Sequence, residues 1–154
     1  MEQVTVRQAT QDDAAELTVL LNRFDGEGAT PAQVAARMQA CAHVLTTYVA
    51  EIDGVMSGFA CLRLVPHLQG DAPYAELTDL YVDDVFRRRG VARALMARVE
   101  SEAQAAGAIE VVVITGSEND PAQAAYRAQG YGDWALAMRK CLYGVADRER
   151  CREP

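Results

Sequence analysis

The sequence predicts a single α/β domain built on a mixed sheet, and three observations support this prediction. The chain has 154 residues, a length typical of one domain. Apolar residues make up 50% of it and charged residues 24%, as in globular proteins, which excludes a mainly disordered chain. Strand-like and helical segments alternate in the second half, and this alternation indicates an α/β fold.

The first half is predicted to run strand, helix, helix, strand, strand. The expected ranges are strand 4–7, helix 12–24, helix 31–41, strand 44–51 and strand 55–63. Thr30, Pro31 and Gln33 give the second helix a hydroxyl cap, a proline in its first turn and a capping-box glutamine. Asp53 and Gly54, between the two strands, are typical of a hairpin turn.

The second half is predicted to alternate strands and helices after a loop at 64–75 that contains two prolines and a glycine. The expected ranges are strand 76–82, helix 90–106, strand 109–115, helix 119–129 and strand 134–142. Gly107 and Gly130 follow the two helices at the position where glycine commonly ends a helix. The apolar run at 109–115 is typical of a buried strand.

The charge distribution favours a small anionic ligand over nucleic acid. The formal net charge is −7, whereas binding to nucleic acid depends on neutralising phosphates. Five arginines nevertheless crowd one segment, namely Arg87, Arg88, Arg89, Arg93 and Arg98. No apolar run approaches the ~20 residues of a membrane span, and the first residues show no leader pattern. We therefore expect a cytoplasmic protein with no nucleic-acid or membrane partner.

The cysteines show no metal-binding spacing, so we expect free thiols and no metal cofactor. The four cysteines are Cys41, Cys61, Cys141 and Cys151. Cys61 lies in an apolar, strand-like run, and we expect it to be a core residue and not a nucleophile.

A first motif joins the strand ending at Val82 to the helix starting near Gly90. Its sequence is Arg87-Arg88-Arg89-Gly90-Val91-Ala92, an Arg-x-x-Gly-x-Ala pattern. The start of a helix exposes about four unpaired N–H groups and a partial positive charge. Small residues let an anion approach these groups, and the arginines add charge. The motif therefore predicts a phosphate or pyrophosphate cradle, although alone it also fits a tight turn with solvated arginines.

A second motif follows the next predicted strand. It reads Asn119-x-x-Ala122-x-x-Ala125-Tyr126-x-x-x-Gly130-Tyr131. Tyr126 is seven residues past Asn119, about two helical turns, so both lie on one helix face. Both motifs follow strands, and ligands of α/β sheets bind at the carboxyl ends of strands.

Together the two motifs resemble those of the GCN5-related N-acetyltransferase (GNAT) superfamily, over residues 3–143. The resemblance implies one domain at 1–143, followed by a charged and frayed tail at 144–154. It implies a mostly antiparallel mixed sheet of six to seven strands flanked by about four helices. It also implies transfer of an acetyl group from acetyl-CoA to an amine, by direct attack in a ternary complex.

The resemblance assigns the cofactor to specific residues. Main-chain groups of the strand end would pair with the pantetheine arm, the helix start would hold the pyrophosphate, and Asn119 would bond the pantetheine. Ala92 replaces the commoner glycine of the motif. The expected cofactor-binding residues are Leu80, Tyr81, Val82, Arg87, Arg88, Arg89, Gly90, Val91, Ala92, Asn119 and Tyr126.

The resemblance also suggests how the amine is activated. An amine with a pKa of about 10.4 costs about 4.6 kcal/mol to deprotonate at pH 7, at ~1.36 kcal/mol per pH unit. Glu76 is the first candidate for the general base, and it lies on the same strand face as Val82 by alternation. Asp79 is the second candidate, and it would face the opposite way unless a β-bulge intervenes. Tyr126 would protonate the departing thiolate, although it also fits a plain core aromatic.

The acceptor is not fixed by the motifs. An acidic surface would suit a cationic small molecule, such as an aminoglycoside or polyamine, or a lysine side chain. Its acids are Asp12, Asp13, Glu16, Asp25, Glu27, Asp71 and Glu76. The last strand is a candidate homodimer interface. The alternative from another class is a non-catalytic module that binds acyl-CoA as a sensor; a nucleotide binder would leave Asn119 and Tyr126 unexplained.

Overall fold

A five-stranded mixed sheet is the centre of the structure, a computed structural model that describes residues 3–26, 28–140 and 142. The described chain forms two units, a sheet unit up to Val113 and a C-terminal unit from Ile114 onward. The strands are β1 (Val4–Gln8), β2 (Thr46–Ile52), β3 (Val55–Val65), β4 (Tyr74–Val82) and β5 (Val111–Val113). They lie side by side in sequence order, antiparallel except for the parallel pair β4–β5. The mixed, mostly antiparallel sheet is confirmed.

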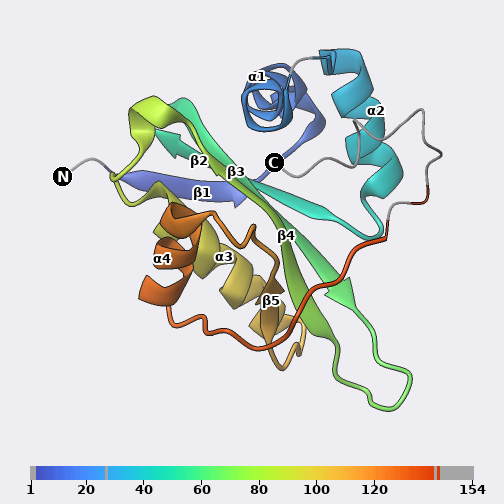
Figure 1. The fold of residues 1–154 in the computed structure, drawn as a ribbon. Coiled ribbons are helices and arrows are strands. Elements are labelled where there is room, and N and C mark those ends of the chain that lie inside the picture. Colours follow the sequence, from blue (N-terminus) through green and yellow to red (C-terminus); the bar gives the residue numbers. More distant parts are fainter. Residues whose placement is uncertain (1–2, 27, 141, 143–154) are drawn as a thin grey trace. The chain divides into compact units, whose positions relative to one another are not determined.

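Four α-helices accompany the sheet within the described residues, as predicted. They are α1 (Ala14–Asp25), α2 (Pro31–Cys41), α3 (Val91–Ala105) and, in the C-terminal unit, α4 (Asp120–Ala128). Two single turns of 3-10 helix, η1 (Gln11–Asp13) and η2 (Asp84–Phe86), precede α1 and follow β4. In the sheet unit, α1 and α2 cover one face of the sheet and α3 covers the other (Figure 1).

Apolar side chains on both faces of the sheet form the core. On the α1 side, Leu17 and Val34 pack with Val49 and Phe59. On the other side, the α3 residues Val91, Leu95 and Val99 are at most 1% exposed. These helical residues are spaced by four, so they line one stripe of α3 that faces the sheet.

The predicted helix start and hairpin turn are both confirmed. The Thr30 hydroxyl accepts a hydrogen bond from the Gln33 N–H at 3.3 Å, and the Gln33 side chain accepts one from the Thr30 N–H at 3.0 Å. Asp53 and Gly54 connect β2 to β3 with φ angles of 52° and 77°. Glycine and aspartate adopt this left-handed region more readily than other residues, which explains their place in the turn.

The prediction of six to seven strands was wrong, because the sheet has five. The strand expected at 134–142 is absent from the described part of that range, where no regular secondary structure forms. Its alternating apolar residues Trp134, Leu136, Met138 and Leu142 are 75–89% exposed. Alternation determines which side chains would share a face, but a strand forms only when its peptide groups pair with a neighbour. The tail expected at 144–154 lies outside the described residues.

An ion-pair cluster joins β1, β2 and the turn before α1. The Arg7 guanidinium donates to both carboxylate oxygens of Asp13, at 2.8 and 2.7 Å, and to Glu51 at 3.0 and 2.6 Å. Asp13 is only 8% exposed and also accepts from the Thr10 N–H at 2.6 Å. The hydrogen bonds from Arg7, followed by that from Thr10, lower the pKa of Asp13 to about 2 despite its burial.

Replacing Asp13 with asparagine is expected to lower stability above pH 4 and flatten its acid dependence. Because the folded-state pKa is depressed, the stabilisation is present above the ordinary value near 4 and is lost as the pH falls towards 2. We expect Asp13→Asn to lower the free energy of unfolding by about 1–2 kcal/mol at pH 6, since the partner arginine is half exposed. Urea unfolding followed by circular dichroism between pH 2 and 6 measures this; parallel curves would contradict it.

Candidate active site

A β-bulge in β4 separates this strand from its neighbour β5. Leu77 is the last β4 residue that pairs with β5, opposite Val113. On the β3 side, Leu77 pairs with Leu62 and Asp79 with Cys61, so Thr78 is an extra residue without an opposite partner. Such a bulge bends the strand and increases its twist. The rest of β4 therefore has an edge with no strand paired to it among the described residues.

The peptide groups of Leu80 and Val82 point to this unpaired edge. The Asp83 N–H donates to the Ser57 carbonyl at 3.0 Å, which makes positions 57 and 83 a hydrogen-bonded pair. Such pairs alternate along antiparallel strands. The pair formed by Tyr81 and Phe59 is therefore also hydrogen-bonded, whereas Leu80 and Val82 turn their peptide groups outward. Tyr81 can thus contribute to a site only through its side chain, which lies on the α1 face with Phe59.

The turn after β4 presents main-chain N–H groups at the start of α3. Arg88 and Gly90 have left-handed φ angles of 63° and 86°, separated by Arg89. Gly90 is the N-cap residue, and no side chain of the described residues caps it. Four N–H groups at a helix start lack partners within the helix, so those of Val91 and Ala92 are available to an anion, as the motif predicts.

The arginine side chains of the turn lie around it. Arg87 pairs with Asp84 at 2.6 Å, and its Nε donates to the Val82 carbonyl at 3.4 Å. The guanidinium of Arg89 lies over the Phe86 ring, 5.1 Å from its centroid. This segment therefore combines outward N–H groups with at least two cationic side chains.

Glu76, the first candidate for the base, has both carboxylate oxygens occupied. Oε2 accepts from the Arg63 Nε at 2.8 Å and also from Arg63 Nη2. Oε1 accepts from the Tyr74 hydroxyl at 3.2 Å. These donors take up most of the acceptor sites of the carboxylate, so these contacts favour a structural role for Glu76.

Asp79 lies on the same sheet face as Glu76 because of the bulge. Their β3 partners, Cys61 and Arg63, are two residues apart and therefore share a face. The Asp79 carboxylate accepts from the Thr78 hydroxyl at 3.0 Å. No arginine or lysine in the part of the chain that the structure describes forms an ion pair with it. Of the two carboxylates, only Glu76 is therefore held by an ion pair with a described arginine or lysine.

Asn119 and Tyr126 belong to the C-terminal unit, at the two ends of α4. The Asn119 side chain caps the helix by accepting from the Ala122 N–H at 3.3 Å. Gln123 fixes the preceding loop, since its Nε2 donates to the carbonyls of Gly116 and Ser117 at 2.9 and 3.0 Å. Partial burial raises the pKa of Tyr126 above its ordinary value of about 10, so its hydroxyl stays protonated at neutral pH.

Two of the seven acids predicted to form a cation-binding surface are already paired. Asp13 is held by Arg7 and Glu76 by Arg63. Glu27 lies outside the described residues. Cys61 is a core residue as expected, since it is 7% exposed and burial raises the pKa of its thiol to about 12.

Sequence reasoning missed three residues that shape the site. Arg63 and Tyr74 hold Glu76, and neither belongs to a motif. Gly58 lies in β3 and allows both β4 and α3 to lie close to this strand. A Cβ at this position would lie 2.6 Å from the Tyr81 carbonyl oxygen and 3.1 Å from Val91 Cγ1. A glycine inside a strand often marks such a close approach, so this signal was present in the sequence.

The bulged β4, the arginine–glycine turn and the helix start after it form a site on an α/β fold that suits an extended ligand with an anionic group. The model of the Acetyltransferase (GNAT) family matches residues 14–131, so the chain belongs to this family. The resemblance seen in the motifs is confirmed, and the protein is an acetyl-CoA-dependent acetyltransferase.

Known proteins of the family extend this comparison. The chain is 32% identical over 130 residues to an aminoglycoside N(6')-acetyltransferase type 1 of Stenotrophomonas maltophilia, covering 82% of this chain and 85% of the relative. A Trypanosoma brucei acetyltransferase has a TM-score of 0.79 at 19% identity, covering 91% of this chain and 100% of that one. Aminoglycoside N-acetyltransferase AAC(6')-Iy, solved in complex with CoA, has a TM-score of 0.77 at 24% identity. The match covers 91% of this chain and 96% of that one.

No helix in the described part of the chain is both long and apolar enough to cross a membrane.

Replacing Gly58 with alanine is expected to destabilise the protein and weaken CoA binding together. The new methyl group would collide with a backbone oxygen, so β4 or α3 must move, at a cost of about 1–3 kcal/mol. Gly70→Ala is the matched control, because a Cβ at Gly70 meets nothing within 4 Å. Thermal unfolding and calorimetric titration with CoA measure the two effects. Equal behaviour of both variants would contradict this role of Gly58.

Proposed function

We propose that the protein transfers the acetyl group of acetyl-CoA to a primary amine of an aminoglycoside-like cationic molecule. The observation that carries the proposal is the unpaired edge of β4 beside the arginine–glycine turn. An extended pantetheine arm would add to this edge as a strand does, through the peptide groups of Leu80 and Val82. The pyrophosphate would lie at the start of α3, against the N–H groups of Val91 and Ala92.

The acceptor class rests on the relatives. Both the Stenotrophomonas maltophilia relative and the CoA-bound neighbour are named as aminoglycoside N-acetyltransferases. A cationic acceptor also suits the net charge of −7, and Asp79 offers it a carboxylate on the α1 face that forms no ion pair with the described arginines and lysines. A lysine side chain is the other acceptor that these charges would fit.

For the base we propose Asp79 ahead of Glu76. The amine is charged at neutral pH and attacks only after losing a proton. Asp79 lies on β4 directly after the bulge and one residue before Leu80, whose outward peptide group would border the thioester. Glu76 would then keep Arg63 and Tyr74 in place beside the acceptor. A carboxylate base passes the proton directly or through one water molecule.

For the acid we propose Tyr126. Attack of the amine on the thioester carbonyl would form a tetrahedral intermediate. Its collapse breaks the carbon–sulfur bond and expels the thiolate of CoA, so a proton donor near the sulfur lowers the barrier. The raised pKa of Tyr126 keeps its hydroxyl protonated for this step. Asn119 would bond the pantetheine while it caps α4. An outward N–H of β4 would stabilise the oxyanion.

The two carboxylates are separated by the activity of their amide variants. We expect Asp79→Asn to lower kcat by about 100-fold, because an amide cannot accept the proton of the amine. Glu76→Gln is expected to lose less than about tenfold, because the amide oxygen still accepts from Arg63. Release of CoA thiol with neomycin as acceptor at neutral pH measures both. A larger loss in Glu76→Gln than in Asp79→Asn would assign the base to Glu76.

The acceptor class is tested with a matched pair of aminoglycosides. Neomycin and paromomycin differ in carrying an amine or a hydroxyl at the 6′ position. We expect neomycin to be acetylated at least about 100-fold faster, because the hydroxyl is the weaker nucleophile. Acetylation of a lysine peptide in place of neomycin would redirect the proposal to proteins. Tight acetyl-CoA binding without turnover on either class, or on polyamines, would favour the sensor.

Replacing Tyr126 with phenylalanine tests the acid. We expect kcat to fall by about 10–100-fold while the Kd for acetyl-CoA changes little, because only the leaving thiolate needs the proton. In the unmodified enzyme, any alkaline limb due to Tyr126 should lie above pH 10, since burial raises its pKa. Steady-state kinetics and calorimetric titration measure this. An unchanged kcat would exclude Tyr126 as the acid.

A further inference from the structure

Asp83, the residue directly after β4, is a buried carboxylate that fixes the direction of the turn. It is only 5% exposed. Its N–H donates to the Ser57 carbonyl at 3.0 Å, and its own carbonyl accepts from the Phe86 N–H at 2.8 Å. Its Oδ1 accepts from the Val85 N–H at 3.2 Å. These bonds join β3 to η2, so Asp83 determines how the chain leaves β4 towards the arginines.

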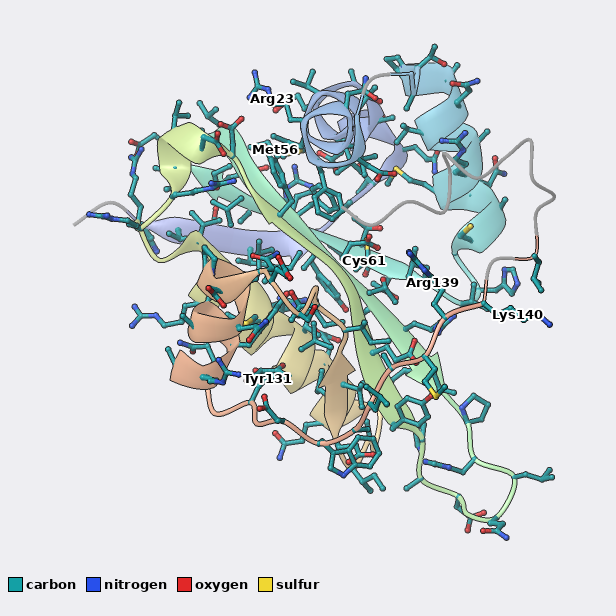
Figure 2. The ribbon with its side chains drawn as sticks, viewed as in Figure 1. Arg23, Met56, Cys61, Tyr131, Arg139 and Lys140 are labelled. Atoms are coloured by element: carbon teal, nitrogen blue, oxygen red, sulfur yellow. The ribbon has the colours of Figure 1, made fainter. Side chains whose placement is uncertain are left out.

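Arg23, in the last turn of α1, neutralises this carboxylate. Its Nη1 donates to the other oxygen, Oδ2, of Asp83. Figure 2 shows Arg23 reaching from α1 towards the turn after β4. The Asp83 side chain is 7% exposed, whereas that of Arg23 is 55% exposed. A carboxylate buried to this degree is costly without a cationic partner, so the turn depends on a residue that lies far away in the sequence.

The other charges near Asp83 show what would follow if Arg23 were removed. Asp84 is the next residue, and it already pairs with Arg87 at 2.6 Å. Without Arg23, two neighbouring carboxylates would compete for Arg87, and like charges so close disfavour each other. Arg87 is also the first arginine of the turn that leads to Gly90. The loss of Arg23 would therefore change the conformation of that turn, although Arg23 belongs to neither motif.

We infer that Arg23 is a positioning residue for the pyrophosphate of acetyl-CoA. By neutralising Asp83, it holds η2 in the conformation that presents residues 87–92 to the anion. In this role Arg23 acts through Asp83 and needs no contact with the cofactor. The inference rests on the proposed function, because it takes the start of α3 as the pyrophosphate site.

The test compares CoA with pantetheine, which lacks the pyrophosphate. The variants are Arg23→Met, the conservative Arg23→Lys, and Arg37→Met as a control that replaces an exposed arginine of the neighbouring helix α2. We expect Arg23→Met to raise the Kd for CoA about tenfold, within the range of coupling between sites. The affinity for pantetheine should change less than twofold. Arg23→Lys should recover most of the CoA affinity, and Arg37→Met should match the unmodified protein.

Three results would overturn the inference, and one of them would also overturn the proposed binding of CoA. Unchanged CoA affinity in Arg23→Met, with CoA bound by the unmodified protein, would overturn the inference alone. So would equal weakening of CoA and pantetheine, because that pattern indicates general loosening of the sheet unit. Failure of the unmodified protein to bind CoA would overturn the proposed cradle and, with it, the role of Arg23.

Discussion

The bulge at Thr78 is the constraint on which the site depends. The extra residue in β4 follows Leu77, where the pairing with β5 ends, and no strand of the described residues pairs with this edge of β4 beyond it. The same residue reverses the alternation of side chains, which brings Asp79 to the face of Glu76. A ladder continued without the bulge would occupy the groups of Leu80 and Val82 that we assign to the cofactor. The bulge therefore accounts both for the edge that we assign to the cofactor and for the orientation of Asp79.

Ion pairs decide which of the many carboxylates remain available for chemistry. Asp13, Glu76 and Asp83 each have an arginine partner outside their own helix or strand, namely Arg7, Arg63 and Arg23. Each pair holds a turn or a strand end in place, because a partly buried carboxylate needs a partner. Asp79 is left without such a partner among the described residues. Ion pairing thus separates Asp79 from Glu76, the other candidate for the base.

Much of the fold was predictable because its signals are local. The cap formed by Thr30 and Gln33, the turn at Asp53 and Gly54, and the helix start at Gly90 depend on residues within a few positions of one another. The strand expected at 134–142 was wrong for the opposite reason. Its alternation is local, but strand formation depends on a partner elsewhere in the chain. Glu76 was chosen as the base by spacing, and the contacts that occupy it come from Arg63 and Tyr74, which spacing does not report.

The sequence by itself determined the family, the order of the elements in the sheet unit and the residues of the two motifs. These features rest on short spacings, on turn chemistry and on charge, all of which are properties of neighbouring residues. The tertiary structure decided the position of the bulge, the facing of Asp79 and the partners of the buried carboxylates. Arg23 and Asp83 are 60 positions apart, and only the packing of α1 against the sheet brings them together. Contacts of this kind depend on the whole fold, so no local pattern encodes them.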